Sequence, residues 1–444
     1  MIESRHRQER PDLPDAAPPP LVRRLLVVWS VTLFLALLWY PPGGGHEGEP
    51  HFWSRVVGPC LFLLVFFWLA ATVLARYEGS AFRSTRRMAT FLGISLVFFL
   101  VASLLPWTGA PSYLVPMAGL TLIWCLFFGH RMALELSLAH WFLLGLVYER
   151  LPERDAVLLM AAAGSAAVLI FFGPVRRYIH IVRMGFLVGL VQGATLTFFL
   201  LLQHLDRSPD TWAGWMVFLG PGLWAAGGGI LTGFILAGLL PLFEAGLEQV
   251  TDITLLEFSD QNHPLLRKLV LEAPGTYHHS LVVGNLAESA TEAIGGHPLW
   301  ARVAAYYHDV GKLHKPEYFS ENERGIGSKH EKLSPTMSTL IISAHTKDGL
   351  EYCRHYHLPE VLVRVCLEHH GTSLIEYFYH QAQDQSPPGE KVREELFRYP
   401  GPKPQTRESA VVFLADSVEA ASRTLGEPTP KRLQNLIHEI VAAF

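Results

Sequence analysis

Residues 305–313 read AYYHDVGKL, an apolar run that ends in an adjacent histidine and aspartate. A His-Asp doublet alone indicates little, because a histidine beside an acid is often only a hydrogen-bonded pair. It indicates more when other residues that can bind metals recur in similar surroundings. Of the 21 histidines in the chain, 12 lie between His278 and His380, which is less than a quarter of the sequence.

Seven imidazoles and carboxylates lie at helix ends or in apolar helical surroundings, and we expect them to point inward: His279, His308, Asp309, His345, His369, His370 and Asp416. Any one of them could be a structural core residue. Seven together favour a metal site, since a buried charge needs a partner or an ion. A ligand set without thiolates suits iron, manganese or zinc. Seven ligands are too many for one ion, and Asp309 could bridge two. Two ions can polarise a water and stabilise both oxygens of a phosphoryl displacement.

The chain from about residue 245 has the pattern of amphipathic helices separated by proline and glycine. Ser334-Pro335 and Thr429-Pro430 each read as an N-cap followed by a first-turn proline. Pro359 is expected to start a helix that Gly371 ends. No stretch shows period-two alternation, so this part is predicted to be all-α. Two segments rich in glycine, proline and charge are expected to be loops: 316–333 and 380–405.

The first half of the chain has the composition of a membrane protein. Of the 444 residues, 50% are hydrophobic and 17% charged, and no lysine precedes Lys268. A helix needs about 20 mostly apolar residues to cross a bilayer, and about eight stretches qualify. The fourth and fifth are separated only by residues 129–131, which predicts a tight helical hairpin. The stretches are 22–40, 56–75, 88–107, 113–129, 132–148, 156–173, 184–203 and 213–241.

The arginines predict the orientation of these spans in the lipid bilayer. Alternating sides gather thirteen arginines on one side and four on the other, which places both chain ends in the cytoplasm. The first span lacks a convincing cleavage site and is interpreted as a retained anchor. The predicted parts are a cytoplasmic tail (1–21), an anchor (22–40), a short extracytoplasmic loop (41–55), a membrane domain (56–243) and a cytoplasmic domain (244–444).

Several features of the sequence limit the possible functions. The net charge of −4 gives no basic face for a nucleic-acid polymer, and the four scattered cysteines predict no disulfide framework or zinc knuckle. Glu135 and His140 are ionisable residues within spans, where such residues are often functional, although Glu135 lies where a structural role is the simpler interpretation. The glycines of 220–233 could allow close helix packing or form a hinge.

The H…HD…D pattern of His279, His308-Asp309 and Asp416 resembles that of the HD-domain metal phosphohydrolases. Longer strings are more specific: APGTYHHSL, YYHDVGKL, KPEYFSEN, EHHGTSLIEYFY, FRYPGPKPQ and LADSVEAASRTL. Together they resemble the bacterial membrane-anchored cyclic-di-AMP phosphodiesterases, the PgpH-type family, which has seven transmembrane helices and a cytoplasmic HD domain. The similarity covers roughly residues 56–440. It implies a protein of the bacterial inner membrane.

The resemblance implies a pair of divalent transition-metal ions, iron or manganese, that hydrolyses cyclic di-AMP to linear pApA. Asp309 would belong to both ligand sets and, with Lys312, to the catalytic centre. His279 is preferred to its neighbour His278, because the family pattern places the first ligand just before a serine. One ion would be held by His279, His308, Asp309 and Asp416, and the other by Asp309, His345, His369 and His370.

Several further residues are candidate substrate contacts. Lys312 follows the doublet by one turn and could meet a phosphate oxygen, and a solvated lysine at a helix end is an equally good interpretation. His330 and Lys332 in the 316–333 loop could also reach a phosphate. His278 could support the fold or touch the substrate, and Tyr377 could stack on adenine, although aromatic residues at that spacing more often pack in a core.

Two departures from the family change the expectations. Only residues 41–55 fill the place of a large extracytoplasmic domain, so we expect regulation through the membrane helices or a partner, with a homodimer as one form. The amphipathic pattern of 429–444 has no stop signal, so the last helix is expected to be shortened relative to the family.

Two alternatives to a cyclic-di-AMP phosphodiesterase stay open. In the first alternative, the same metal centre hydrolyses another nucleotide, cyclic di-GMP or guanosine tetraphosphate. The absence of a GYP string after EHHGT counts against cyclic di-GMP. The other is an inactive membrane receptor or scaffold.

Overall fold

The structure is a computed structural model that describes residues 84–148, 151–204, 211–323, 329–387, 390–426 and 428–443. The predicted tail, anchor, short loop and second span lie outside these residues. The chain divides into two compact units, Met1–Thr251 and Asp252–Phe444, called here the N-terminal and C-terminal units. The described residues are helical apart from turns, loops and one isolated bridge between Leu374 and Arg398, which agrees with the predicted all-α class.

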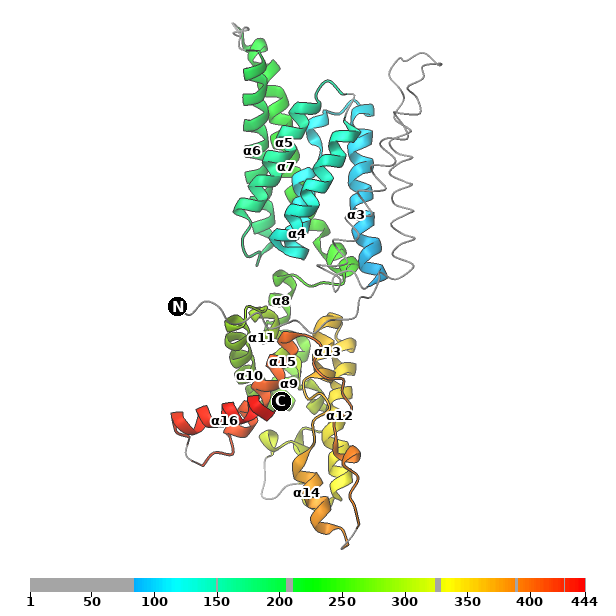
Figure 1. Cartoon of the computed structure of the whole chain (residues 1–444), viewed down its shortest axis with the longest axis vertical. Helices are drawn as coiled ribbons and strands as arrows, with labels where there is room; N and C mark the ends of the chain where they lie inside the picture. Colours follow the sequence, from blue (N-terminus) through cyan, green and yellow to red (C-terminus); the bar gives the residue numbers. More distant parts are fainter. Residues whose placement is uncertain are drawn as a thin grey trace, which may run out of the picture. The chain divides into compact units, whose positions relative to one another are not determined.

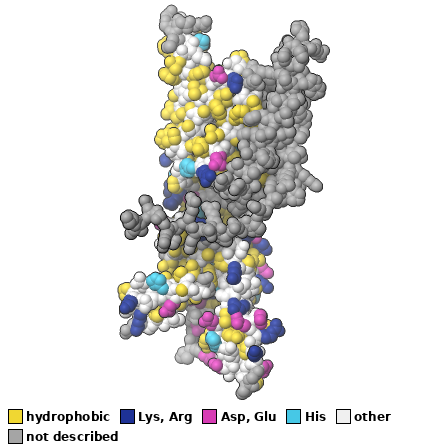
Figure 2. All heavy atoms as spheres, viewed as in Figure 1, with side chains coloured by type: hydrophobic (Ala, Val, Ile, Leu, Met, Phe, Trp, Pro, Cys, Tyr) yellow, Lys and Arg dark blue, Asp and Glu magenta, His cyan; other side chains and the backbone are white. Residues whose placement is uncertain are grey.

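The N-terminal unit consists, where it is described, of long apolar helices (Figure 1). Within the described residues, five segments are long and apolar enough to cross a membrane. Many apolar side chains on them face outward, such as Ile170 at 71% and Leu190 at 69% exposure, and Figure 2 shows the resulting apolar surface. Such a surface is stable in lipid and not in water. The α-helices are α3 (Thr85–Leu104), α4 (Met117–Val147), α5 (Arg154–Phe171), α6 (Tyr178–Gln203) and α7 (Trp212–Leu247), with short 3-10 turns η1 (Leu105–Trp107) and η2 (Ser112–Leu114).

The helix α4 contains the predicted hairpin. Gly129 has φ +78°, a conformation open to glycine because it lacks a Cβ atom. Ser137 Oγ lies 2.8 Å from Thr121 Oγ1, 16 residues away, whereas a straight helix would separate them by about 24 Å. The two arms of α4 are therefore antiparallel, and the predicted hairpin is confirmed.

Both ionisable residues predicted to lie within spans have structural partners. Glu135 forms an exposed i,i+4 ion pair with Arg131 at 3.3 Å. His140 is buried, contacts Ser95 Oγ at 3.0 Å and stacks on the ring of Phe99. These contacts account for both residues without a transport function.

Glycines bring α6 and α7 into close contact, as one of the two interpretations of the 220–233 stretch predicts. A Cβ atom on Gly229 would lie 2.5 Å from the backbone of Gly189, and one on Gly185 would lie 2.7 Å from Gly233. Small residues at four-residue spacing are the usual means by which membrane helices approach closely. The helix α7 also continues to Leu247, beyond the predicted end of its span at 241.

We expect Gly229→Leu to destabilise the N-terminal unit by about 2–3 kcal/mol, because a side chain forced into a packed interface strains it. Gly227→Leu is the matched control, since nothing lies within 4 Å of a Cβ atom there. It should not lower stability. Thermal unfolding of the full chain in detergent measures both, and equal stabilities would contradict the packing role.

Three helices of the C-terminal unit begin at or directly after the prolines that were predicted to start them, Pro335, Pro359 and Pro430. Five of the described ones start at a proline, and Ser334 caps α12 by accepting a hydrogen bond from the Met337 amide. The predicted loop from 380 is wrong over residues 380–385, which continue α14, because glutamine and alanine are good helix formers. The helices are α8 (Asp252–Phe258), α9 (Pro264–Glu272), α10 (Pro274–Ala293), α11 (Pro298–Tyr307), α12 (Pro335–His355), α13 (Glu360–Glu368), α14 (Glu376–Gln385), α15 (Arg407–Ser422) and α16 (Pro430–Ala443).

Short 3-10 turns link several of these helices: η3 (Val310–His314), η4 (Pro316–Tyr318), η5 (Ser320–Asn322), η6 (Lys329–Lys332) and η7 (Glu394–Phe397). The helix α11 is central to the core, and Val303, Ala304 and Tyr307 are fully buried. Its C-terminal end therefore lies inside the unit, and the sequence places His308 and Asp309 there.

Candidate metal centre

The structure brings the seven inward-pointing residues predicted from the sequence into one buried cluster. They come from α10, the end of α11, α12, the end of α13 and α15. The ligand atoms form two compact groups, and the atoms within each lie no more than 4.8 Å apart. The groups are Asp309, His345, His369 and His370, and His279, His308 and Asp416.

The Asp309 carboxylate lies between the two groups. Its Oδ2 is 3.4 Å from His279 Nε2 and 3.3 Å from His308 Nε2. Its Oδ1 is 3.3 Å from His345 Nε2 and 3.5 Å from His369 Nε2. Each oxygen thus faces a different pair of histidines, which is the arrangement that a carboxylate bridging two ions requires.

The Asp416 carboxylate faces three histidines, since its Oδ1 also lies 3.8 Å from His308 Nε2. Its Oδ1 is 3.0 Å from His279 Nε2, and its Oδ2 is 3.6 Å from His370 Nδ1. Asp416 therefore contacts histidines of both groups.

Backbone carbonyls orient three of the histidines. The Nδ1 atoms of His308, His345 and His369 each contact a carbonyl of the preceding turn, at 2.6, 2.6 and 2.9 Å. An imidazole held in this way donates from Nδ1 and presents Nε2, which binds a metal when that atom carries no proton. In all three residues it is Nε2 that faces the cluster.

Glu419 orients His279 and was not predicted from the sequence. Its Oε2 lies 2.6 Å from His279 Nδ1, and its Oε1 accepts a hydrogen bond from Arg423 Nε at 2.7 Å. Glu419 lies three residues after Asp416 on α15, a spacing that puts both carboxylates on one helix face. That spacing was the available signal in the sequence.

We expect Glu419→Gln to weaken metal binding about 10- to 100-fold, the usual effect of losing a carboxylate that orients a histidine ligand. The amide keeps the size of the side chain and removes its charge. Titration of the metal-free chain with Mn²⁺ measures the change. Glu439→Gln, on the exposed side of α16, is the matched control and should bind as the unaltered chain does. Equal affinities in the two variants would contradict the role.

The carboxylates make the cluster strongly attractive to cations. Burial lowers the pKa of His308, but the charges of Asp309 and Asp416 outweigh it and leave that pKa well above its usual range. Burial also lowers the pKa of His279, but its hydrogen bonds to Asp416 and Glu419 outweigh burial and raise that pKa. Burial lowers the pKa of His345 to about 3, so that this imidazole is neutral and ready to bind an ion.

Divalent ions fit this donor set. Among the described residues, three buried ligand atoms form no hydrogen bond: His279 Nε2, His308 Nε2 and Asp309 Oδ1. Unpaired buried polar atoms are costly. The two Nε2 atoms face Asp309 Oδ2, and Asp309 Oδ1 faces His345 and His369. An ion in each group would satisfy them.

Lys312 lies beside the cluster, as predicted. Its Nζ is 2.7 Å from Asp309 Oδ2 and 2.8 Å from Glu321 Oε1. Burial lowers its pKa, but these two carboxylates outweigh it and raise the pKa above the usual value, so the lysine stays charged. Glu321 was not singled out, although it belongs to the KPEYFSEN string.

None of the four other candidate substrate contacts belongs to the cluster. His278 and Lys332 are exposed, and Tyr377 is 73% exposed and packs on Phe378. His330 contacts the Tyr318 carbonyl at 2.8 Å. A contact of these four residues with substrate stays a prediction.

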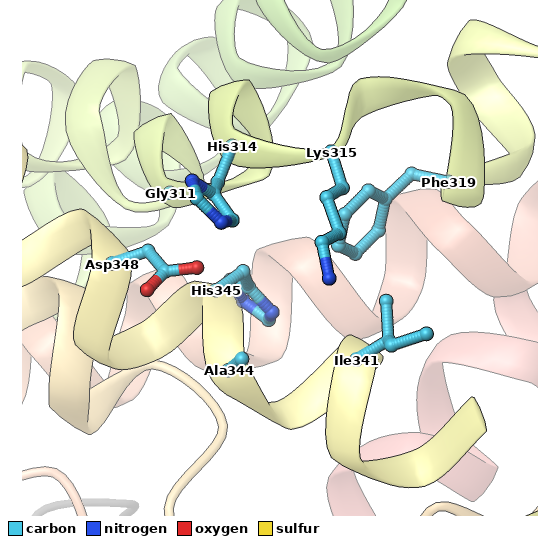
Figure 3. A pocket seen from close by; sticks show the side chains of 8 residues that line it. All are labelled: Gly311, His314, Lys315, Phe319, Ile341, Ala344, His345 and Asp348. Carbon is cyan, nitrogen blue, oxygen red and sulfur yellow. The ribbon is translucent and has the colours of Figure 1, made fainter. Parts of the chain in front are cut away.

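A pocket adjoins the cluster between α12 and the η3–η4 segment, and His345 forms part of its wall (Figure 3). The Lys315 ammonium and the His345 imidazole face the same space in Figure 3. The lining residues are Gly311, His314, Lys315, Phe319, Ile341, Ala344, His345 and Asp348.

Two families match the chain. Residues 53–251 match the family described as 7TM receptor with intracellular HD hydrolase, and residues 276–421 match the HD domain. The apolar helices and the His/Asp cluster together define a multi-pass membrane protein with an HD domain. The chain belongs to the PgpH-type family of these proteins.

The similar proteins include two named relatives. Cyclic-di-AMP phosphodiesterase PgpH of Bacillus subtilis (strain 168) is 42% identical over 280 residues, 63% of this chain and 38% of that protein. PgpH of Listeria monocytogenes (serotype 1/2a, strain 10403S) is 37% identical over 296 residues, 67% of this chain and 40% of that protein. The chain thus spans well under half the length of either relative. The crystal structure of the L. monocytogenes PgpH HD domain is 45% identical, with a TM-score of 0.39, and covers 41% of this chain and 84% of that chain.

Proposed function

We propose that the chain is a membrane-bound, metal-dependent phosphodiesterase that hydrolyses cyclic di-AMP to pApA. The observation that carries the proposal is the Asp309 carboxylate, whose two oxygens face different pairs of histidines. Cyclic di-AMP is proposed as the substrate because both relatives are named cyclic-di-AMP phosphodiesterases.

The ligands of the two ions would be those that the resemblance implies. His279, His308, Asp309 and Asp416 would hold one ion, and Asp309, His345, His369 and His370 the other. Nitrogen and oxygen donors without sulfur suit iron, manganese or zinc, and the resemblance to the PgpH-type family favours iron or manganese. Bound ions would supply an activated water and neutralise charge on the attacking and leaving oxygens.

Hydrolysis opens one phosphodiester of the cyclic dinucleotide. A water oxygen bonds to phosphorus, the bond from phosphorus to the ribose 3′-oxygen breaks, and that oxygen takes up a proton. Lys312 is charged, and we assign it to the developing charge on a phosphate oxygen. Glu321 would hold the ammonium in place at 2.8 Å while substrate binds.

The remaining proposals concern location and partners. The boundary expected near 243–244 would separate a membrane domain from a cytoplasmic catalytic domain, in the bacterial inner membrane with both chain ends in the cytoplasm. Regulation would act through the membrane helices, by a homodimer or a membrane partner.

The test is conversion of cyclic di-AMP by the full chain, purified in detergent and loaded with Mn²⁺. We expect pApA as the product, identified by chromatography against a standard. Asp416→Asn is the inactive control. Absence of pApA from the loaded, folded chain would overturn the proposal.

The alternatives predict other results in the same preparation. An enzyme for cyclic di-GMP or guanosine tetraphosphate would bind those nucleotides more tightly than cyclic di-AMP in calorimetric competition. An inactive receptor would bind a nucleotide without hydrolysing it, or would contain no metal by elemental analysis.

A further inference from the structure

His370 is held differently from the other histidines of the cluster. The others place Nδ1 on a backbone carbonyl or on Glu419, whereas His370 turns its Nδ1 toward Asp416. Its side chain is 19% exposed, the largest exposure among these histidines. Its orientation must therefore come from another kind of contact.

The ring of Tyr399 supplies that contact. It stacks on the His370 imidazole with ring centroids 4.1 Å apart and an angle of 26° between the planes. Tyr399 also meets the His345 ring edge-on at 6.1 Å. Aromatic pairs at such distances attract each other beyond the effect of burial.

The backbone fixes Tyr399 in this place. The Tyr399 amide donates to the Ser373 carbonyl at 3.0 Å, and the Ile375 amide donates to the Phe397 carbonyl at 2.8 Å. Residues 397–399 therefore run antiparallel to residues 373–375, which follow His370 closely in the chain. Phe397 is 1% exposed and anchors this stretch in the core.

The far end of the same segment is attached beside the ligands as well. The Gln405 amide donates to Glu368 Oε2 at 3.1 Å, and Glu368 directly precedes His369. The FRYPGPKPQ string, residues 397–405, is thus bound at both ends to the segment that carries His369 and His370. These two attachments give a structural role to the FRYPGPKPQ string, which takes no part in the proposed hydrolysis.

We propose that Tyr399 is a positioning residue, whose stacking fixes the imidazole plane of His370 for the ion shared with Asp309, His345 and His369. The inference rests on the proposed metal centre. The stacking on His370 requires the aromatic ring of Tyr399 and not its hydroxyl group. The other ion, assigned to His279, His308, Asp309 and Asp416, should depend on this contact much less, because the ring of Tyr399 stacks on His370 and not on those residues.

The test uses the metal-free full chain in detergent, titrated with Mn²⁺ alone and followed by calorimetry and by the electron paramagnetic resonance of bound Mn²⁺. Tyr399→Leu should weaken one of the two ions roughly tenfold, in the range for lost support of a ligand. Tyr399→Phe should bind both ions as the unaltered chain does.

Three outcomes would overturn the inference: unchanged binding in Tyr399→Leu, equal weakening in Tyr399→Phe, or loss of both ions together, which would indicate general unfolding. The ion at His279, His308 and Asp416 serves as an internal measure of folding. Because no nucleotide is present, a failure of cyclic di-AMP hydrolysis would leave this result intact and would count only against the proposed function.

Discussion

Asp309→Asn should abolish hydrolysis of cyclic di-AMP and remove at least one metal ion from each chain. The substitution keeps the size of the side chain but removes the charge and one of the two acceptor oxygens that face the histidine pairs. Metal ions supply several kcal/mol of charge stabilisation in a phosphoryl transition state, so we expect a fall of about 10³- to 10⁴-fold in the rate. Elemental analysis and the pApA assay measure the two effects.

The variant should still fold, which makes the result interpretable. Lys312 keeps Glu321 as a partner at 2.8 Å, so its buried charge is not left alone. Asp384→Asn makes the same chemical change on the exposed surface of α14 and should keep full activity and both ions. An Asp309→Asn chain with two ions and normal turnover would show that the carboxylate does not bridge.

The cluster could be predicted because its ligands carry a local signal. Histidines and aspartates in apolar helical surroundings, such as His308 and Asp309 at the end of AYYHDVGKL, are costly unless they bind something. The hairpin at Gly129 and the helices that start at a proline could also be predicted, because turn and cap residues determine the backbone within a few positions of themselves. In each case the physical cause lies in the segment itself.

The residues that orient these side chains carry a weaker signal, because their partners lie far away in the chain. Glu419 contacts His279, which lies 140 positions earlier in the chain. The local sequence of α15 does not distinguish this carboxylate from a solvated one, because its burial depends on packing against α10. Tyr399 stands in a stretch rich in proline and glycine that was expected to be only a loop. Its role depends on the backbone pairing of residues 397–399 with residues 373–375. A pairing of three residues is too short to produce a recognisable alternation of apolar and polar residues in the sequence.

Removal of metal should lower the melting temperature of the C-terminal unit and leave that of the N-terminal unit unchanged. An ion at a hundred times its dissociation constant stabilises the folded state by about 2.7 kcal/mol. For a unit of this size each kcal/mol is worth roughly 2–4 °C, so losing two ions should cost about 10–20 °C. The cause is local, since three buried atoms that form no hydrogen bond, His279 Nε2, His308 Nε2 and Asp309 Oδ1, lie at the cluster.

Differential scanning calorimetry of the full chain, with excess Mn²⁺ and with chelator, measures this shift. Asp309→Asn should show only a small difference between the two conditions, because it lacks the shared ligand. Gly229→Leu should lower the transition of the N-terminal unit and leave the metal-dependent shift of the C-terminal unit at full size. If chelator left both transitions in place, the seven side chains would be a polar core that needs no ion, and the metal-dependent chemistry would lose its basis.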